Sequence, residues 1–376
     1  MTASRPLLVA LSGGVDSAVT AGLLAEQGRS LVGVFMRNGI SAGEAAVSRS
    51  CCSVSDARDA RRVADHLGIP FYVQDLSRPF AELIQDFSRD YVAGRTPNPC
   101  VLCNNDLKFG ELLTLAHDLG CDGVATGHYA RLEADDEGVP VLRRGLDRGK
   151  DQSYLLHGLR RDQLAQAHFP LGGLSKDEVR AQAHRLGLAV ADKPDSADIC
   201  FVPGGDYRAV VRERLGHLGT EGEIVDREGR AVATHQGVGS FTVGQRRGLG
   251  VTFGEPAYVT DIDPQSGRVS VGRREDLARA SCLVGPMNWL VDERPGAGSL
   301  DSQTLRAQLR HHHDPEEVRV VEVGDGRVRL EFASPSQDVS PGQYAVLFRD
   351  DRVLGGGRIL EAEPVRSDAA DQESQA

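Results

Sequence analysis

The first half of the chain alternates between two kinds of segment. Short apolar runs, typical of buried parallel strands, occupy Leu7–Leu11, Leu31–Met36, Phe71–Leu76 and Gly123–Thr126. Segments with apolar residues at helical spacing lie between them, at Val15–Glu26, Asp56–Leu67 and Leu107–Leu119. This alternation predicts a Rossmann-like α/β domain, in which helices cover both faces of a parallel sheet.

The pattern changes after about residue 200, where glycines are frequent and short strands follow one another. Val318–Val323 and Arg327–Phe332 flank the turn Gly324-Asp325-Gly326, which is a hairpin signal. Further strands are expected at Ala257–Ile262, Arg268–Gly272, Tyr344–Phe348 and Arg352–Leu354. The second half is therefore expected to hold a small β-rich central domain and an antiparallel β-barrel.

A chain of 376 residues is too long for one ordinary domain. We expect the α/β domain over 1–199, the central domain over 200–280 and the barrel over 281–362. The remaining segment, 363–376, is polar and net acidic, and we expect it to be disordered.

Composition and charge narrow the function classes. The net charge of −11 argues against an indiscriminate binder of polyanions, but basic residues cluster locally around Arg143, Arg144 and Lys150. No apolar run approaches the roughly 20 residues that cross a bilayer, and Met1–Pro6 does not resemble a signal peptide. We therefore expect a cytoplasmic protein with no membrane partner. Its seven cysteines do not indicate a disulfide scaffold.

The strongest local motif is SGGVDS, Ser12–Ser17, which follows the first strand and opens the first helix. Its glycines let backbone amides face a ligand, and a helix N-terminus favours anions. Ser12 and Ser17 offer hydroxyl groups to phosphate, and Asp16 is a candidate ligand for phosphate-bound Mg²⁺. The alternative is a glycine-rich turn without a ligand, but the complete motif between strand and helix favours phosphate. A Walker lysine is absent.

Two cysteines lie in loops punctuated by proline. Cys103 follows TPNPCVL and is expected at or just before the N-terminus of a helix that begins near Asp106 and is capped by Asn104 or Asn105. That position lowers the pKa of a thiol and favours the nucleophilic thiolate. Cys200 ends the polar segment KPDSADIC.

These thiols have three interpretations. They are buried and inert, as Cys121 and Cys282 are expected to be, or they are a catalytic pair in which one thiol carries persulfide sulfur. The third interpretation is a zinc or iron–sulfur site. Its ligands would be drawn from Cys100, Cys103, Cys200, Cys51 and Cys52.

The phosphate loop resembles that of the ATP pyrophosphatase superfamily, whose members adenylate a substrate. Over nearly the whole chain, from Leu7 to about Leu360, the sequence resembles the tRNA-specific 2-thiouridylases. The segments that carry the resemblance are ALSGGVDS, CCS, RTPNPCVLCN, ATGHYAR, KDQSYLL, KPDSADICFVP and GQRRGLG. Their fixed order is far more specific than any one of them alone.

The resemblance implies a role for each matching position. Cys103 would be the nucleophile and Cys200 the persulfide carrier, and Cys103 would close onto Cys200 as a disulfide bond. The target base would be approached by Asn98, Pro99 and Cys100, and tRNA would be contacted by Lys150, Asp151, Gln152, Arg310 and His311. ATP would be bound by Ala10, Leu11, Ser12, Gly13, Gly14, Val15, Asp16, Ser17, Met36 and Gly127.

The implied reaction activates the C2 carbonyl of the wobble uridine, in the tRNA anticodon loop, as an adenylate. Sulfur then replaces the carbonyl oxygen, and AMP and pyrophosphate are released. The sulfur would come as a persulfide from a cysteine desulfurase, directly or through a sulfur-relay protein.

The sequence departs from the family pattern at two places. Many relatives carry aspartate where this chain has Cys100, so an iron–sulfur variant stays open, with Cys100, Cys103 and Cys200 holding a [4Fe-4S] cluster. An Arg-Tyr pair of the family is matched here by Arg310 and His311. We expect His311–His313 to lie on a strand and to point to opposite faces, which argues against a metal site.

Three rival functions make different predictions. Amidotransferase-like chemistry would need a glutaminase, for which no signature is visible. A non-catalytic, ATP-sensing RNA-binding adaptor would bind tRNA without forming AMP. A zinc-stapled structural protein would unfold when the metal is chelated.

Overall fold

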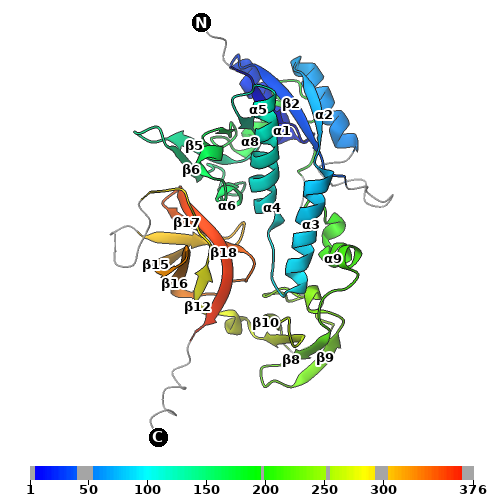
Figure 1. Ribbon diagram of the computed structural model, residues 1–376, viewed down its shortest axis with the longest axis vertical. Coiled ribbons are helices and arrows are strands. Elements are labelled where there is room, and N and C mark those ends of the chain that lie inside the picture. The colour runs from blue at the N-terminus through cyan, green and yellow to red at the C-terminus, as the bar shows by residue number, and fades with distance from the viewer. Residues whose placement is uncertain (1–4, 40–53, 196–198, 251–254, 293–303, 366–376) are drawn as a thin grey trace. The chain divides into compact units, whose positions relative to one another are not determined.

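The computed structural model describes residues 5–39, 54–195, 199–250, 255–292 and 304–365 (Figure 1). The chain divides into two compact units. The first comprises residues 1–86, 99–210 and 351–353, and the second comprises residues 87–98, 211–350 and 354–376. Cys51 and Cys52 lie outside the described residues.

The first unit is built on a parallel sheet with the strand order β3-β2-β1-β4-β7. Its central strand is apolar because helices cover both faces, and Leu8 and Val9 are fully buried. The strands are β1 Leu7–Ala10, β2 Leu31–Arg37, β3 Phe71–Asp75, β4 Val124–Ala125 and β7 Ala167–His168. The predicted parallel α/β fold is confirmed.

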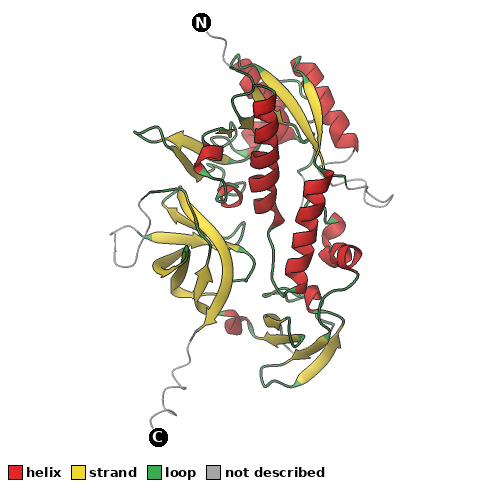
Figure 2. Ribbon diagram, in the orientation of Figure 1, coloured by secondary structure: helices red, strands yellow, loops and turns green. Residues whose placement is uncertain are grey.

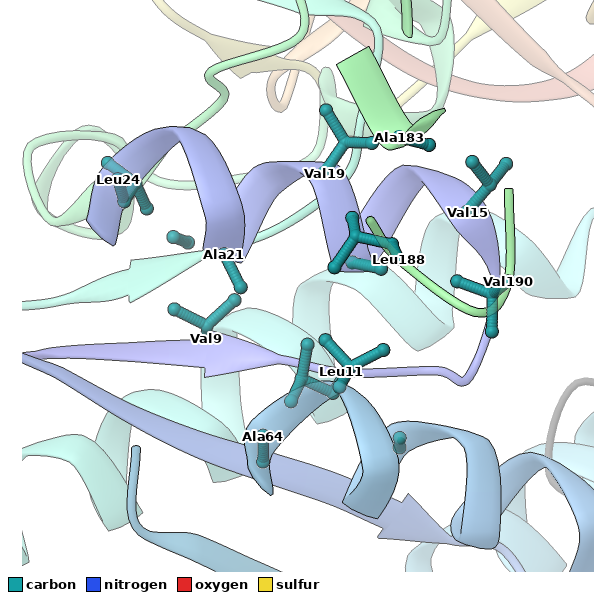
Figure 3. Close-up of a cluster of buried hydrophobic side chains, with 14 of the residues drawn as sticks. Val9, Leu11, Val15, Val19, Ala21, Leu24, Ala64, Ala183, Leu188 and Val190 are labelled. Atoms are coloured by element: carbon teal, nitrogen blue, oxygen red, sulfur yellow. The ribbon is translucent and has the colours of Figure 1, made fainter. Parts of the chain in front are cut away.

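The core around β1 is formed with helices α1 (Val15–Glu26) and α8 (Lys176–Arg185). Figure 3 shows Val19 of α1 beside Ala183 of α8. Gly22 permits this close packing, because a Cβ there would lie 2.6 Å from the side chain of Leu186. Each large aliphatic side chain buried here contributes about 1.5–3 kcal/mol.

Two further elements of the N-terminal region match the predicted helices over 56–67 and 107–119, and the others were not predicted (Figure 2). The predicted helix Asp56–Leu67 is α2, Val54–Leu67. The remaining elements are α3 Ser77–Val92, α5 Leu112–Asp118, β5 Ala130–Ala134, β6 Pro140–Arg144, α6 Ser153–Leu156, α7 Arg161–Leu164, the 3₁₀ turn Pro203–Gly205 and α9 Tyr207–Leu215.

The helix that carries Cys103 differs from the prediction. It begins at Pro99 as α4 (Pro99–Leu102) and continues directly into the π-helix η1 (Cys103–Glu111). Proline suits a first helical position, because it has no amide to leave unpaired and its φ is already helical. Asn104 does not cap a helix near Asp106, since its side chain donates to the Leu155 carbonyl at 3.1 Å.

The second unit contains a four-stranded sheet with the order β10-β11-β8-β9. Its β10–β11 hairpin is the predicted one, and β8 joins β11 in parallel. Apolar residues from these strands and the turn Val238–Ser240 form a separate core. The strands are β8 Gly222–Val225, β9 Ala231–His235, β10 Tyr258–Asp263 and β11 Arg268–Gly272.

The second unit also contains an antiparallel barrel. Its strands follow the order β12-β16-β15-β14-β17-β18, and β12 pairs with both β16 and β18, which closes the ring. The strands are β12 Arg279–Val284, β14 Leu305–Gln308, β15 Glu316–Gly324, β16 Arg327–Ser336, β17 Tyr344–Arg349 and β18 Arg352–Pro364, with β13 Asn288–Trp289 added on β18 and the 3₁₀ turn Arg274–Leu277 preceding β12. The predicted β-rich module and barrel are confirmed.

The prediction that the histidine run lies on a strand is wrong. Strand β14 ends at Gln308, and His311–His313 form the turn before β15, where His312 has a φ of 73°. The chain reverses here, so strand alternation does not set the directions of these side chains. Within the part of the chain that is described, no helix is both long enough and apolar enough to cross a membrane.

Candidate active site

The phosphate loop lies where β1 passes into α1. Ser12 donates its amide to Ser17 Oγ at 3.1 Å, and Ser17 Oγ donates to the Gly14 carbonyl at 3.1 Å. Gly13 has a φ of 76°, and a Cβ there would lie 2.3 Å from the Asp56 carbonyl oxygen. Because Gly14 is the N-cap and has no side chain, the first amides of α1 are left for an anion.

Asp16 lies in the first turn of α1, and two side chains from distant segments contact it. Lys176, the first residue of α8, donates Nζ to both carboxylate oxygens at 2.7 and 2.9 Å. The Tyr129 hydroxyl donates to Oδ1 at 2.8 Å. Burial, followed by the charge of Asp16, raises the pKa of Tyr129, so this hydroxyl stays a donor. A carboxylate at this place suits Mg²⁺ bound to phosphate, and the lysine supplies the cation that the motif lacks.

A second lysine contacts the other side of the loop. Lys193 donates Nζ to the Gly13 carbonyl at 2.8 Å and to Asp56 and Asp59 at 2.7 Å each. Burial opposes the charged form, but the two carboxylates outweigh it and raise the pKa of Lys193. Lys193 begins the segment that leads to Cys200, so the ion pairs fix the start of that segment at the phosphate loop.

The two other predicted nucleotide contacts, Met36 and Gly127, lie near the carboxyl ends of strands in the sheet. Met36 is half-buried near the carboxyl end of β2, beside the end of β1. Gly127 follows β4 and packs on the loop itself, because a Cβ there would lie 2.9 Å from the Asp16 carbonyl carbon and the Ser17 nitrogen. Ligands bind at the carboxyl ends of strands in open α/β sheets, and both positions meet that condition.

Asp195 connects the basic residues around the site. It pairs with Lys150 and Lys176 at 2.8 Å each and with Arg180 at 2.9 Å. Burial alone would raise the pKa of Asp195, but the hydrogen bonds and charges of Lys150 and Lys176 outweigh it and lower the pKa to about 2. A chain of ion pairs therefore runs from the predicted tRNA contact Lys150 through Asp195 and Lys176 to Asp16.

The two residues after Lys150 have roles inside the protein. Asp151 is buried and accepts from Arg144 Nε at 2.6 Å and from the Gly145 amide at 3.0 Å. Gln152 accepts from the Tyr129 amide at 3.1 Å. Both side chains fix the loop that presents Lys150, and their contact with tRNA stays a prediction.

The cysteines occupy half-buried positions in the first unit. Cys100 and Cys103 lie three residues apart, on one side of the helical segment, and Asn98 precedes that segment. Cys200 lies in a turn, and the next residue, Phe201, is buried with its ring edge-on to Phe80 at 5.8 Å. The prediction that Cys103 lies at a helix N-terminus is wrong, because Cys103 follows the first helical turn and Cys100 is the cysteine in that turn.

A [4Fe-4S] cluster does not fit this arrangement. Among the residues that the structure describes, no three or more His, Cys, Asp or Glu side chains gather closely enough to hold a metal ion. Cys100, Cys103 and Cys200 therefore do not form the ligand set that the iron–sulfur variant requires.

In the second unit, Arg310 makes several internal contacts. Its guanidinium donates to the Asp338 carbonyl at 3.0 Å, to Ser340 Oγ at 2.7 Å and to the Val243 carbonyl at 3.4 Å. Arg310 therefore joins the barrel to the neighbouring β-rich module. The contacts of Arg310 and His311 with tRNA stay predictions.

Lys176, Lys193 and Tyr129 were not predicted from the sequence to lie at this site. Each reaches the phosphate loop from more than 100 residues away in the sequence. Local patterns do not indicate such contacts. Tyr129 and Lys193 lie in the segments ATGHYAR and KPDSADICFVP, which was the only available signal for them, and Lys176 lies in none of the family segments.

Known protein families and individual relatives match most of the chain. Three family profiles match in order: the tRNA methyl transferase HUP domain over residues 5–204, the tRNA methyl transferase PRC-barrel domain over 208–273 and the aminomethyltransferase beta-barrel domain over 279–359. The tRNA-specific 2-thiouridylase MnmA of Geobacter metallireducens is 44% identical over 364 residues, covering 95% of this chain and 97% of that protein. The corresponding protein of Sorangium cellulosum is 46% identical over 368 residues, covering 97% and 94%. With identity of this extent along both units, the chain belongs to the tRNA-specific 2-thiouridylase family.

Proposed function

We propose that the protein replaces the C2 oxygen of a tRNA uridine with sulfur and consumes ATP in doing so. The observation that carries the proposal is the grouping, in one compact unit, of a phosphate loop with the segments that bear Cys103 and Cys200. Family membership narrows the acceptor to a uridine of tRNA. The wobble uridine is the base we infer, because an unpaired anticodon base is readily turned into a pocket.

In the first step, the uridine O2 attacks the α-phosphorus of ATP, and the bond to pyrophosphate breaks. The amides of the first turn of α1 face the phosphates, and Ser12 and Ser17 supply hydroxyl groups. Lys176 lies beside Asp16 and supplies positive charge to the departing pyrophosphate. Mg²⁺ held by Asp16 and the phosphates would add further charge neutralisation. Met36 and Gly127 line the nucleotide.

In the second step, the terminal sulfur of a Cys200 persulfide attacks C2, and the C2–O2 bond breaks. The oxygen leaves on AMP with both bonding electrons. The Cys103 thiolate then attacks the Cys200 sulfur, which forms a disulfide and releases the thiocarbonyl sulfur with the electrons of the broken S–S bond. A thiol reductant returns both cysteines to thiols before the next cycle.

Binding of tRNA and delivery of sulfur complete the proposal. Lys150, with Asp151 and Gln152 behind it, would contact the tRNA backbone, as would Arg310 and His311 in the second unit. Asn98, Pro99 and Cys100 would approach the target base. The sulfur donor would be a protein persulfide, from a cysteine desulfurase or a sulfur-relay protein, and the reaction would take place in the cytoplasm.

The test is a thiolation assay with one defined tRNA, ATP, a cysteine desulfurase and a thiol reductant. We expect one AMP for each 2-thiouridine, and we expect Cys103→Ala and Cys200→Ala to form none. Cys121→Ala is the matched control, because Cys121 is a buried core thiol. Formation of 2-thiouridine without AMP, or full activity of both cysteine variants, would overturn the proposal.

A further inference from the structure

The chain uses its two basic residue types very unequally. It contains 39 arginines and only four lysines, Lys108, Lys150, Lys176 and Lys193. All four lie in the first unit. Arginine thus supplies nearly all the positive charge of the protein, and lysine occurs only in the unit that holds the candidate site. The two side chains differ chemically, because an ammonium is a compact point charge and a guanidinium is a planar fork.

Three of the four lysines already have carboxylate partners. Lys150 and Lys176 pair with Asp195, Lys176 pairs also with Asp16, and Lys193 pairs with Asp56. The loop thus gains ammonium groups, but the carboxylates beside them offset much of the added charge. To bind an additional anion, the site needs a cation that is not already paired with a carboxylate.

Lys108 is that cation. It is half-buried, and among the described residues its Nζ has no carboxylate within 4.0 Å. Its hydrogen-bond partner is His128 Nε2, at 3.4 Å. His128 is buried beside the rings of Phe109 and Phe169, and its Nδ1 lies 2.7 Å from Thr126 Oγ1.

His128 offers Lys108 no compensating charge. Burial, followed by the charge of Lys108, holds the pKa of His128 well below its usual range, so the ring is neutral. With its proton on Nδ1 and directed at Thr126, the ring can accept from the ammonium at Nε2. The ammonium is therefore oriented by a neutral partner, and its full charge remains available to a bound anion.

The position of Lys108 relates it to both halves of the proposed reaction. It lies five residues after Cys103 in the π-helix η1, in which the amide of residue i+5 bonds to the carbonyl of residue i. Lys108 therefore lies one π-turn beyond the nucleophile. Its partner His128 follows Gly127, which packs on the Asp16–Ser17 peptide of the phosphate loop. Lys108 thus belongs to the helix that carries Cys103, and its ammonium contacts a residue adjacent to one that packs on the phosphate loop.

The sulfur-transfer step of the proposed function creates an anion. While AMP is attached to the uridine, its phosphate carries one negative charge, and when the C2–O2 bond breaks the oxygen takes both electrons and the phosphate acquires a second charge. We propose that Lys108 is a catalytic residue whose ammonium contacts this phosphate and stabilises AMP as it leaves. The inference rests on the proposed function and assigns Lys108 to its second step.

The test separates adenylation from sulfur transfer in single-turnover reactions of the full-length protein with tRNA. In Lys108→Met we expect pyrophosphate release at the wild-type rate, accumulation of adenylated tRNA, and sulfur transfer slowed about 10²-fold, the loss typical when one electrostatic stabiliser is removed. Lys108→Arg should recover only part of this rate, because its charge is spread over a fork. Arg78→Met is the matched control, since it also removes a cation, from a side chain that is 92% exposed.

Chemical rescue distinguishes catalysis from support of the fold. Added methylammonium should restore sulfur transfer in Lys108→Ala and should leave the wild-type rate unchanged. Equal loss of adenylation and sulfur transfer in Lys108→Met, wild-type sulfur transfer in that variant, or no rescue of Lys108→Ala would each overturn the assignment. If the wild-type protein itself forms no AMP, it is the proposed function that has failed.

Discussion

Replacement of Gly127 by alanine tests whether the β4 segment positions the phosphate loop. The added Cβ would lie 2.9 Å from the Asp16 carbonyl carbon and the Ser17 nitrogen and 3.0 Å from Asp16 Cβ. Ordinary carbon contacts begin near 3.5 Å, so the first turn of α1 must shift by roughly 0.5 Å. Backbone atoms cannot rotate away as a flexible side chain would. We expect the free energy of unfolding to fall by about 1–3 kcal/mol, as in other overpacked sites.

The same shift misplaces the amides that face the phosphates. We therefore expect the ATP dissociation constant of Gly127→Ala to rise about tenfold, equivalent to about 1.4 kcal/mol. Isothermal titration calorimetry measures the ATP affinity, and urea unfolding measures the stability. Gly173→Ala is the matched control, because nothing lies within 4 Å of a Cβ at Gly173 in the same unit. If Gly127→Ala bound ATP and unfolded like the wild type, the claimed contact would be refuted.

Three further predictions follow from buried groups. Burial lowers the pKa of His157 to about 4 against an opposing hydrogen bond to Tyr154, so the folded state binds this proton more weakly than the unfolded state does. The free energy of unfolding should therefore fall by roughly 3 kcal/mol between about pH 6.5 and pH 4, and urea unfolding of His157→Gln should lack this component. Burial raises the pKa of Cys282 to about 12. In the native protein at pH 7.5, iodoacetamide should therefore label Cys103 long before Cys282. Equal labelling rates of the two cysteines, measured by mass spectrometry, would contradict this. The side chain of Asp90 is 12% exposed and accepts hydrogen bonds from Arg95 and Arg358. Asp90→Asn should therefore lower the free energy of unfolding by about 1–3 kcal/mol. An unchanged melting temperature of this variant would contradict the prediction.

The sheet and the barrel could be predicted because their signals are local. The apolar run of β1 and the helical spacing of α1 lie within a dozen residues each, and α1 spans the predicted Val15–Glu26. The turn Gly324-Asp325-Gly326 joins β15 to β16 as predicted. Hydrophobic periodicity and turn chemistry are sufficient for such elements.

The helix around Cys103 was harder to predict, because two signals competed. Asn104 and Asn105 resemble caps, but Pro99 starts the helix five residues earlier, and Asn104 is used in tertiary packing. A π-helix has no simple sequence pattern, so the relation between Cys103 and Lys108 is visible only in the structure. Contacts such as Lys176 with Asp16 depend on the fold as a whole.

The division of the chain into units has a practical consequence. Residues 87–98 belong to the second unit, although the segments before and after them belong to the first. They supply it with the buried rings of Phe87 and Tyr91, and the Thr96 amide donates to the Pro341 carbonyl at 2.8 Å. No single cut in the polypeptide yields both units whole. A truncated fragment that ends near residue 210 would carry these rings without the rest of the second unit, and we expect it to aggregate when it is expressed alone.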